Sequence, residues 1–407
     1  MIAPIELLIT ALFAATAALM AAVTLPAALA PLVIPRLRDP APPSAARHTR
    51  AAATIILAAR DEQAAIADTV TRALAQPAAA RVIAVNDRST DRTPEILDDL
   101  ARHNPRLSVL HIERLPEGWM GKTHALHAAL AHAPPATETP WILFIDADSR
   151  LETATLDAAI CHAEYRHADH LVALPGYPAT STIGAAFASA LYTIFLSRCV
   201  LNQLRFPRNG VGIGAFTLIS QRALDAVGGL RTLRLEVVED VKLGVLVKRA
   251  RLKTAVVSAA DRVTIDWQAN AEALTSLLEK NFFAMARYSV PYAAALITAN
   301  TLCYAAGILG IPTAILLHAR SDDPLIHNPP AIAAAAAAIA LSLKAIPALY
   351  LARLYHWPRA AALLTPLTAI APAIALTHSM RTTLKQRGVR WRDHHYTLAE
   401  LRKHQVW

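Results

Sequence analysis

Apolar residues gather at both ends of the chain and leave a long stretch of mixed polarity between them. Residues 2–34 contain a single charged side chain, Glu6. That length exceeds the roughly 20 residues that a helix needs to cross a bilayer, and the stretch lacks the basic start of a cleaved signal peptide. We therefore expect residues 1–35 to form a transmembrane anchor that stays on the protein.

The apolar pattern returns after residue 290. Residues 291–318 carry no Asp, Glu, Lys or Arg, residues 330–352 carry only Lys344, and residues 360–377 carry none. Two prolines interrupt the last of these segments, where a helix can stop or bend. We expect a C-terminal membrane region over residues 291–379 with two or three hydrophobic spans.

Basic residues flank these apolar regions. The predicted linker, residues 36–50, holds four arginines and three prolines, and the predicted tail, residues 380–407, holds seven Lys or Arg against two acids. The basic linker places the following block in the cytoplasm, at what we expect to be a bacterial inner membrane. Three complete crossings after that block would put the tail outside, so either the last segment does not fully cross or the first lies at the interface.

The middle block, residues 51–290, alternates short apolar runs with helical patterns. The apolar runs that predict strands are residues 54–58, 81–85, 107–112 and 141–145. This alternation is typical of an α/β fold with a mostly parallel sheet. Polar clusters follow three of the runs, at residues 60–62, 86–91 and 146–148. Because ligands of such sheets bind beyond the carboxyl ends of the strands, these clusters are candidate site residues.

One segment of the middle block departs from this pattern. Residues 183–196 are uncharged and largely apolar. At 14 residues the run is short for a membrane span. It predicts either a core helix or an amphipathic helix at the membrane surface.

Composition narrows the class of protein. Of 407 residues, 54% are apolar and 17% are charged, against roughly 25% charged in an ordinary soluble domain. This excludes a disordered chain and argues against a wholly soluble one. The net charge of +9 suits an anionic membrane surface or a phosphorylated substrate. A membrane-proximal tail explains the basic C-terminus, so we expect no nucleic-acid partner. The three cysteines are too far apart for a disulfide framework or a cysteine zinc site.

Two aspartates follow the apolar run at residues 141–145. Asp146 and Asp148 flank the small residue Ala147, and strand alternation would point both side chains to one side. Two carboxylates so placed can hold a hard divalent ion, which in turn can bind a diphosphate. The alternative is a solvated turn with acidic caps. The position at the end of a buried strand favours the ion site.

Two further loops have candidate ligand contacts. Asp87 could accept hydrogen bonds from a nucleoside, or its loop could be only a turn before a helix. Lys122 stands at a predicted helix start, where it could contact a phosphate or be an ordinary loop lysine. A P-loop is excluded here because Pro116 occupies the position of its first glycine.

A pair of acids precedes the helical run after residue 238. Glu239 and Asp240 are either favourable charges at a helix N-terminus or include a general base. The pattern alone does not decide between these interpretations.

Taken in order, these pieces resemble the membrane-bound family 2 glycosyltransferases with the GT-A fold. The matching segments are Ala59-Arg60-Asp61-Glu62 for A-R-N-E, residues 85–93 for the D-D-x-S-x-D-x-T loop, Gly118 to Lys122 for G-W-x-G-K, Asp146-Ala147-Asp148 for D-x-D, and Gly228-Gly229 with Glu239-Asp240 for G-G-F and E-D. The flanking apolar segments, and a tail similar to W-R-G-x-x-Y, resemble the ceramide glucosyltransferase-like and hopanoid-associated branches.

The resemblance implies the donor contacts. Arg60, Glu62 and Asp87 would contact the nucleotide, and Lys122 would contact the donor. The donor would be a nucleotide sugar, which we expect to be a UDP-sugar.

The resemblance also implies the chemistry. Asp146 and Asp148 would hold the sugar diphosphate through Mg²⁺ or Mn²⁺. Asp240 would be the general base that activates the acceptor hydroxyl, and the product would form with inversion. The acceptor would be a membrane lipid such as a hopanoid or a sphingolipid.

One signature of many relatives is absent. Q-x-x-R-W is replaced by a segment at residues 277–283, in which Lys280 is the basic residue. This weakens the interpretation as a processive polysaccharide synthase and favours single transfer to a lipid. A polymer synthase and a non-catalytic membrane scaffold remain the alternatives.

Overall fold

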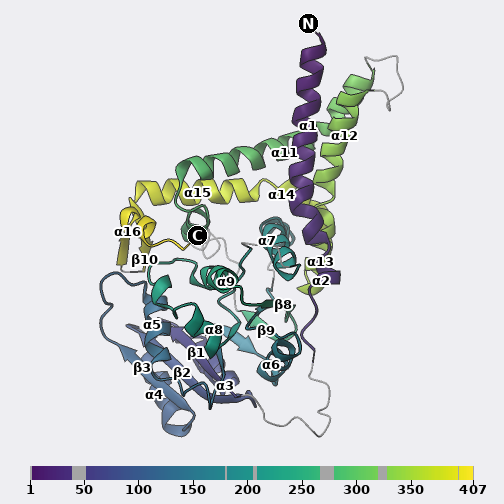
Figure 1. Cartoon of the computed structure of the whole chain (residues 1–407). Helices are drawn as coiled ribbons and strands as arrows, with labels where there is room; N and C mark the ends of the chain where they lie inside the picture. Colours follow the sequence, from purple (N-terminus) through teal and green to yellow (C-terminus); the bar gives the residue numbers. More distant parts are fainter. Residues whose placement is uncertain are drawn as a thin grey trace. The chain divides into compact units, whose positions relative to one another are not determined.

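The computed structural model describes residues 2–38, 52–178, 181–204, 209–265, 279–319, 328–392 and 394–406. The chain forms two compact units (Figure 1). The first unit comprises Met1–Val33, Pro178–Leu201 and Gln268–Leu398, and the second comprises Ile34–Tyr177, Asn202–Trp267 and Ala399–Trp407. Most of the predicted linker, residues 39–50, lies outside the described residues.

The second unit is built on a seven-stranded sheet. Its strands, in spatial order, are β3 (Leu107–Ile112), β2 (Ala79–Asp87), β1 (Ala53–Ala59), β4 (Trp141–Asp146), β7 (Thr217–Ser220), β6 (His170–Leu174) and β8 (Thr254–Ser258). The pairs β3–β2, β2–β1, β1–β4 and β6–β8 are parallel, and β7 is antiparallel to both of its neighbours. The predicted α/β class with a mostly parallel sheet is confirmed, and the four predicted strands are β1 to β4.

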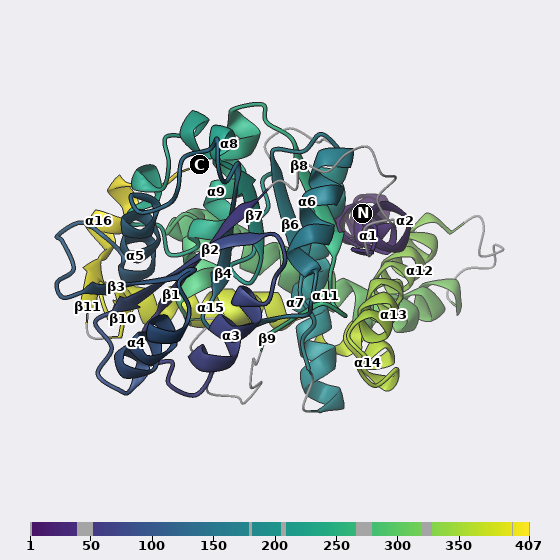
Figure 2. The ribbon, with the colours of Figure 1, turned by 90° about the horizontal axis from the view of Figure 1, so that it is seen from below.

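Helices cover both faces of this sheet (Figure 2). The helices are α3 (Ile66–Leu74), α4 (Thr93–His103) and α6 (Thr155–Tyr165) on one face, and α5 (Gly121–Leu130), α8 (Gln221–Ala226) and α9 (Glu239–Arg249) on the other. Side chains alternate between these faces along each strand. Ile55 and Leu57 of β1 pack with the first helix set, and Ile56 packs with the second. Burial on both faces explains why the central strands β1 and β4 are largely apolar.

A short, separate two-stranded sheet begins directly after the turn that follows Asp146. It pairs β5 (Ser149–Leu151) antiparallel with β9 (Val263–Ile265). Asp148 therefore lies in the tight turn between β4 and β5. The turn fixes both aspartates of the D-x-D segment to ordered backbone.

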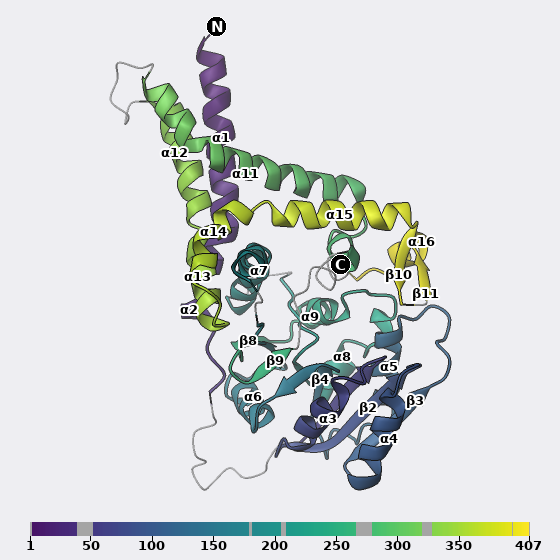
Figure 3. The same cartoon turned by 180° about the vertical axis from the view of Figure 1, so that it is seen from behind.

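The first unit consists mainly of apolar helices. They are α1 (Ile2–Ala28), α2 (Ala30–Val33), α7 (Thr182–Gln203), α11 (Val290–Ala319), α12 (Pro329–Ser342), α13 (Ala345–Leu354), α14 (Ala360–Thr368) and α15 (Ala371–Lys385). Helices α1, α11 and α12 share a core rich in alanine (Figure 3). Small residues let the helices approach closely; a Cβ at Gly307 of α11 would lie 2.6 Å from the Leu341 Cβ atom.

Four helical segments are long and apolar enough to cross a membrane, and a bent pair could add a fifth. The four are Ile5–Val33, Thr182–Gln203, Val290–Ala319 and Pro329–Leu354, and the pair is Ala360–Thr368 with Ala371–Lys385, bent by 55°. The apolar segments predicted at both ends of the chain are thus helices of spanning length. The number of crossings and their orientation stay predictions.

The apolar run at residues 183–196 lies in the longer helix α7. The helix continues to Gln203, includes Arg198 and reaches 22 residues. It belongs to the first unit, and its Ala186 carbonyl accepts a hydrogen bond of 2.9 Å from Thr368 Oγ1. Residues 51–290 therefore do not all belong to one compact unit.

Candidate active site

The predicted site residues leave neighbouring strands at one edge of the sheet. In the parallel register Ala59 of β1 lies opposite Asn86 of β2, and Ala58 lies opposite Asp146 of β4. The chain runs outward from β1 to β3 and then returns to the other side of β1 with β4. Such a switch of direction opens a crevice at the carboxyl ends of the strands, where α/β proteins bind ligands.

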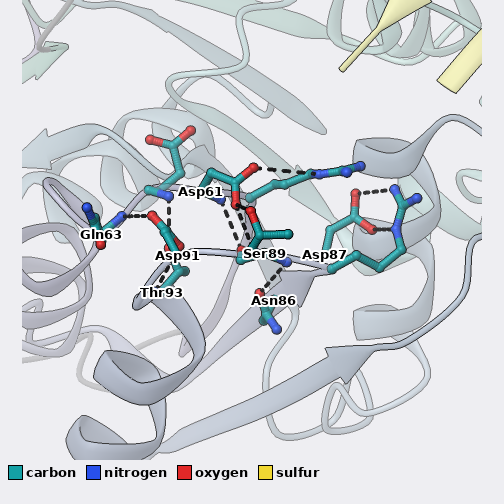
Figure 4. A network of polar contacts seen from close by, with 11 residues as sticks. Asp61, Gln63, Asn86, Asp87, Ser89, Asp91 and Thr93 are labelled. Atoms are coloured by element: carbon teal, nitrogen blue, oxygen red, sulfur yellow. Dashed lines mark hydrogen bonds and ion pairs between the residues drawn. The ribbon is translucent and has the colours of Figure 1, made fainter. Parts of the chain in front are cut away.

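Hydrogen bonds tie the loop after β1 to the loop after β2 (Figure 4). Asp61 Oδ1 accepts from the Thr90 backbone N–H at 2.7 Å, and the Asp61 N–H donates to Ser89 Oγ at 3.0 Å. The Glu62 N–H donates to Thr93 Oγ1 at 2.8 Å. These contacts make the two loops a single ordered rim. The sequence suggests Asp61 only as a substitute for an asparagine, whereas here its carboxylate joins the loops.

Asp91 completes this rim. It accepts from the Gln63 N–H at 3.0 Å and from Thr93 Oγ1 at 2.6 Å. Desolvation by itself would raise the pKa of the Asp91 carboxyl, but the hydrogen bonds from Thr93 and Gln63 outweigh it and hold the pKa below its ordinary value. Asp91 is therefore a structural anion that orders the rim.

The three residues expected to contact the nucleotide lie on this rim. Arg60 and Glu62 belong to the β1 loop, and Asp87 is the last residue of β2. The Arg88 guanidinium donates two hydrogen bonds to the Asp87 carboxylate, from Nε to Oδ1 at 2.8 Å and from a terminal nitrogen to Oδ2 at 3.0 Å. A Cβ at Gly121 would come against the same carboxylate, so a larger residue there would displace the Asp87 and Arg88 side chains. The Gly121–Lys122 segment consequently packs directly against Asp87.

Lys122 lies at the centre of a charged cluster. Its Nζ atom is 2.6 Å from Asp146 Oδ1 and 2.8 Å from Glu239 Oε1. Burial alone would lower the pKa of this ammonium group. Asp146, Glu239 and Asp240 outweigh burial and hold the pKa well above its ordinary value. Lys122 is therefore a fixed positive charge, and it joins β4 to the start of α9.

Asp240 lies in the first turn of α9 beside this cluster. Its Oδ1 atom accepts a hydrogen bond of 2.7 Å from the Val241 N–H. Burial and the neighbouring Glu239 carboxylate raise the pKa of Asp240 to about 6, although Lys122 opposes the shift. A carboxylate with a pKa near 6 is still ionised at neutral pH and is a stronger base than an exposed one.

A glycine-rich segment at residues 210–214 forms another wall of this site, and the sequence analysis did not identify it. A Cβ at Gly214 would lie 2.6 Å from Asp146 Oδ2 and 3.0 Å from Lys122 Nζ. Gly212 lies against the Asp240 backbone, and Gly244 of α9 lies against Val211. The spacing Gly210-Val211-Gly212-Ile213-Gly214 was the available signal, because alternate glycines permit close backbone approach.

The carboxylates suit a divalent ion that is shared with a ligand. Among the described residues no group of three or more His, Cys, Asp or Glu could hold a metal alone. Lys122 neutralises only one of the three charges on Asp146, Glu239 and Asp240. Mg²⁺ and similar ions commonly bind one or two carboxylates together with substrate phosphates. Asp146 and Asp148 fit that donor set.

Residues 54–228 match the family model described as Glycosyl transferase family 2. A similar curated protein is the 4,4'-diaponeurosporenoate glycosyltransferase of Staphylococcus aureus strain USA300, 27% identical over 197 residues, which are 47% of this chain and 50% of that protein. The match spans about half the length of such relatives.

Similar solved structures share little sequence with this chain. The mannosyltransferase PcManGT from Pyrobaculum calidifontis, in complex with GDP-Man and Mn²⁺, is 17% identical, with a TM-score of 0.47 over 90% of this chain and 99% of that one. TarS 1-349 of S. aureus, in complex with UDP-GlcNAc, is 13% identical, with a TM-score of 0.39 over 85% of this chain and 98% of that one.

Proposed function

We propose that this protein is an inverting, metal-dependent glycosyltransferase that moves a sugar from a nucleotide-sugar donor to a membrane lipid. The observation that supports the proposal most strongly is the cluster in which Lys122 bridges Asp146 and Glu239 beside Asp240. Lys122 and Asp146 of this cluster lie within residues 54–228, which match the family 2 model, and Asp146 ends a strand at the carboxyl edge of the sheet. Glu239 and Asp240 lie beyond the matched residues. It combines a cation for a diphosphate with a carboxylate of raised basicity.

The donor would lie across the rim and the cluster. Arg60, Glu62 and Asp87 would contact the nucleoside, and Lys122 would contact the diphosphate. Asp146 and Asp148 would hold Mg²⁺ or Mn²⁺, which when bound supplies positive charge to the departing diphosphate. Lys122 adds fixed charge at the same point, and stabilisation of developing negative charge by preorganised groups is a major source of catalysis.

Asp240 would act on the acceptor. The acceptor oxygen forms a bond to the anomeric carbon while the bond from that carbon to the diphosphate oxygen breaks. The acceptor proton passes to the Asp240 carboxylate, and the electron pair leaves with the nucleoside diphosphate. Attack from the face opposite the leaving group inverts the anomeric configuration.

The apolar helices support a lipid acceptor. Four or five helical segments of spanning length belong to the same chain as the site, and a similar protein is named for glycosyl transfer to 4,4'-diaponeurosporenoate. We propose a hydroxyl-bearing lipid such as a hopanoid or a sphingolipid as the acceptor, and a UDP-sugar as the donor. The reaction would take place at the cytoplasmic face of a bacterial inner membrane.

A transfer assay tests the proposal. Full-length protein in lipid nanodiscs would receive Mn²⁺, total bacterial lipid and a panel of radiolabelled nucleotide sugars. We expect label in the organic phase with wild type and a loss of about 10²-fold or more in Asp240→Asn, because a general base contributes about that much. Asp225→Asn, an exposed carboxylate on α8, is the matched control. Label only in polymer, or equal transfer by Asp240→Asn, would contradict the proposal.

A further inference from the structure

The last described residues of the chain are anchored in the second unit. Val406 is buried in the same apolar core as Leu243 and Val247 of α9. Its backbone N–H donates to Glu236 Oε1, and its carbonyl accepts a hydrogen bond of 2.8 Å from Lys242 Nζ. The main chain of Val406 thus contacts two oppositely charged side chains at once.

Glu236 and Lys242 form a buried ion pair that depends on these contacts. Lys242 Nζ lies 3.6 Å from Glu236 Oε2, and the two side chains are 0% and 4% exposed. A buried ion pair is stable only when further hydrogen bonds satisfy its remaining donors and acceptors. Val406 supplies an acceptor to the ammonium and a donor to the carboxylate. Glu236 and Lys242 therefore form a binding site for the main chain of Val406, which we call the receptor.

The two receptor residues, Glu236 and Lys242, lie on either side of the proposed general base, Asp240, in the sequence. Glu236 lies three residues before Glu239, in the segment that leads into α9, and Lys242 follows Asp240 by two residues in α9. The Lys242 N–H also donates to the Val238 carbonyl at 3.1 Å, within the first turn of the helix. A shift of the receptor would consequently move the residues that carry Glu239 and Asp240.

The tail also approaches the segment that presents Lys122. The Arg234 carbonyl accepts a hydrogen bond of 2.6 Å from the Met120 N–H, two residues before Lys122. The Arg234 guanidinium lies 3.4 Å from the His404 ring. The segment at residues 234–242 therefore connects the tail with both sides of the charged cluster.

We propose that residues 404–406 are positioning residues of the active site, whose docking on Glu236 and Lys242 sets the placement of Asp240 and Lys122. The role is indirect, because the tail acts through α9 and through Arg234. The consequence for turnover rests on the proposed transferase function, whereas the consequence for local order does not.

Hydrogen–deuterium exchange tests the effect on local order. The substitution Val406→Pro removes the N–H donor and retains an apolar residue and the carbonyl. In full-length protein in nanodiscs, we expect faster exchange at residues 118–124 and 234–246 and unchanged exchange in β1 and β2. Lys403→Ala, at an exposed position of the same tail, is the control. The proposal would be overturned if both segments of Val406→Pro exchanged at the wild-type rate. It would also be overturned if the exchange rate rose evenly over the whole sheet.

Steady-state kinetics test the effect on turnover. We expect Val406→Pro, and a chain ending at Lys403, to lose about 10-fold or more in kcat, since small misplacements of reacting groups cost rate strongly. The donor KM should rise as well, because Lys122 is the proposed contact of the donor diphosphate. Wild-type kcat in both variants would overturn the proposal. If wild type itself transfers no sugar, the proposed function fails, and the exchange experiment still decides the role of the tail.

Discussion

At the residue scale, the site depends on one lysine among three carboxylates. Lys122 contacts Asp146 and Glu239 directly and lowers the pKa of Asp240 against the stronger opposing effect of burial. Each of these side chains is polar and partly or wholly removed from water, which is unfavourable for folding unless the charges compensate. Two testable consequences follow from this balance.

The first prediction concerns pH. Because the raised pKa of Asp240 is about 6, kcat/KM should fall about ten-fold per unit below pH 6. The folded state favours the protonated carboxyl, so its contribution to stability is present below the ordinary pKa near 4 and is lost as pH rises to 6. Asp240→Asn should therefore raise the free energy of unfolding at pH 7 by roughly 2–3 kcal/mol. A pH–rate profile and thermal unfolding measure both effects, and a less stable Asp240→Asn would contradict them.

The second prediction concerns the metal. Removal of divalent ions by a chelator should abolish transfer, and Mn²⁺ or Mg²⁺ should restore it. Asp148→Asn should raise the Mn²⁺ concentration for half-maximal activity by about 10-fold or more, because altered metal sites typically lose that much affinity. A titration of activity with Mn²⁺ measures this, with Asp225→Asn as the control. Metal-independent transfer by wild type would be incompatible with the proposed site.

At the element scale, parallel strands bring distant residues to one edge, and loops then fix their positions. Much of this was predictable. The runs at residues 54–58, 81–85, 107–112 and 141–145 are β1 to β4. Strands β1 and β4 and most of β2 are buried and therefore largely apolar, whereas the edge strand β3 is mostly only partly buried. Because β1, β2 and β4 are parallel, the polar clusters that follow these strands lie at the same edge of the sheet.

Other parts of the site could not be predicted from local pattern. The receptor for Val406 uses a fully buried lysine, Lys242, whose sequence context is that of an exposed helix residue. Its partner lies more than 160 positions away and contributes only backbone atoms. A backbone hydrogen bond depends on no particular side chain, so the sequence gives no sign of it.

The third prediction tests the rim. Thr93→Val removes the hydroxyl that donates to Asp91 and accepts from the Glu62 N–H. The loss of two hydrogen bonds at a buried position should lower the free energy of unfolding by about 2 kcal/mol. Thr71→Val, on the exposed face of α3, should change it little. Thermal unfolding of both variants measures the difference, and equal midpoints would refute the role of the rim.

The fourth prediction tests the glycine-rich wall. Gly214→Ala would place a methyl group 2.6 Å from Asp146 Oδ2, so the Lys122–Asp146 ion pair must shift. We expect at least a 10-fold loss of kcat/KM, because catalytic groups tolerate little displacement. Gly184→Ala, at an exposed position in α7, is the matched control. Full activity in Gly214→Ala would show that the wall does not position the cluster.

At the scale of the whole molecule, the chain combines a unit built on an α/β sheet with a unit of apolar helices. A water-soluble donor and a lipid acceptor can meet only at a membrane surface. The transfer that we propose would use both kinds of unit. The small residues of α11 and α12 pack the helices, while large apolar side chains such as Leu7, Leu8 and Leu32 are exposed as they would be toward lipid.

The most direct test of the central claim is the anomeric configuration of the lipid product. Wild-type protein in nanodiscs would receive an α-linked nucleotide sugar labelled with ¹³C at the anomeric carbon, together with Mn²⁺ and the lipid acceptor. One-step displacement assisted by Asp240 predicts a β-linked glycolipid in the NMR spectrum, and none above background from Asp240→Asn. An α-linked glycolipid from wild type would contradict the account.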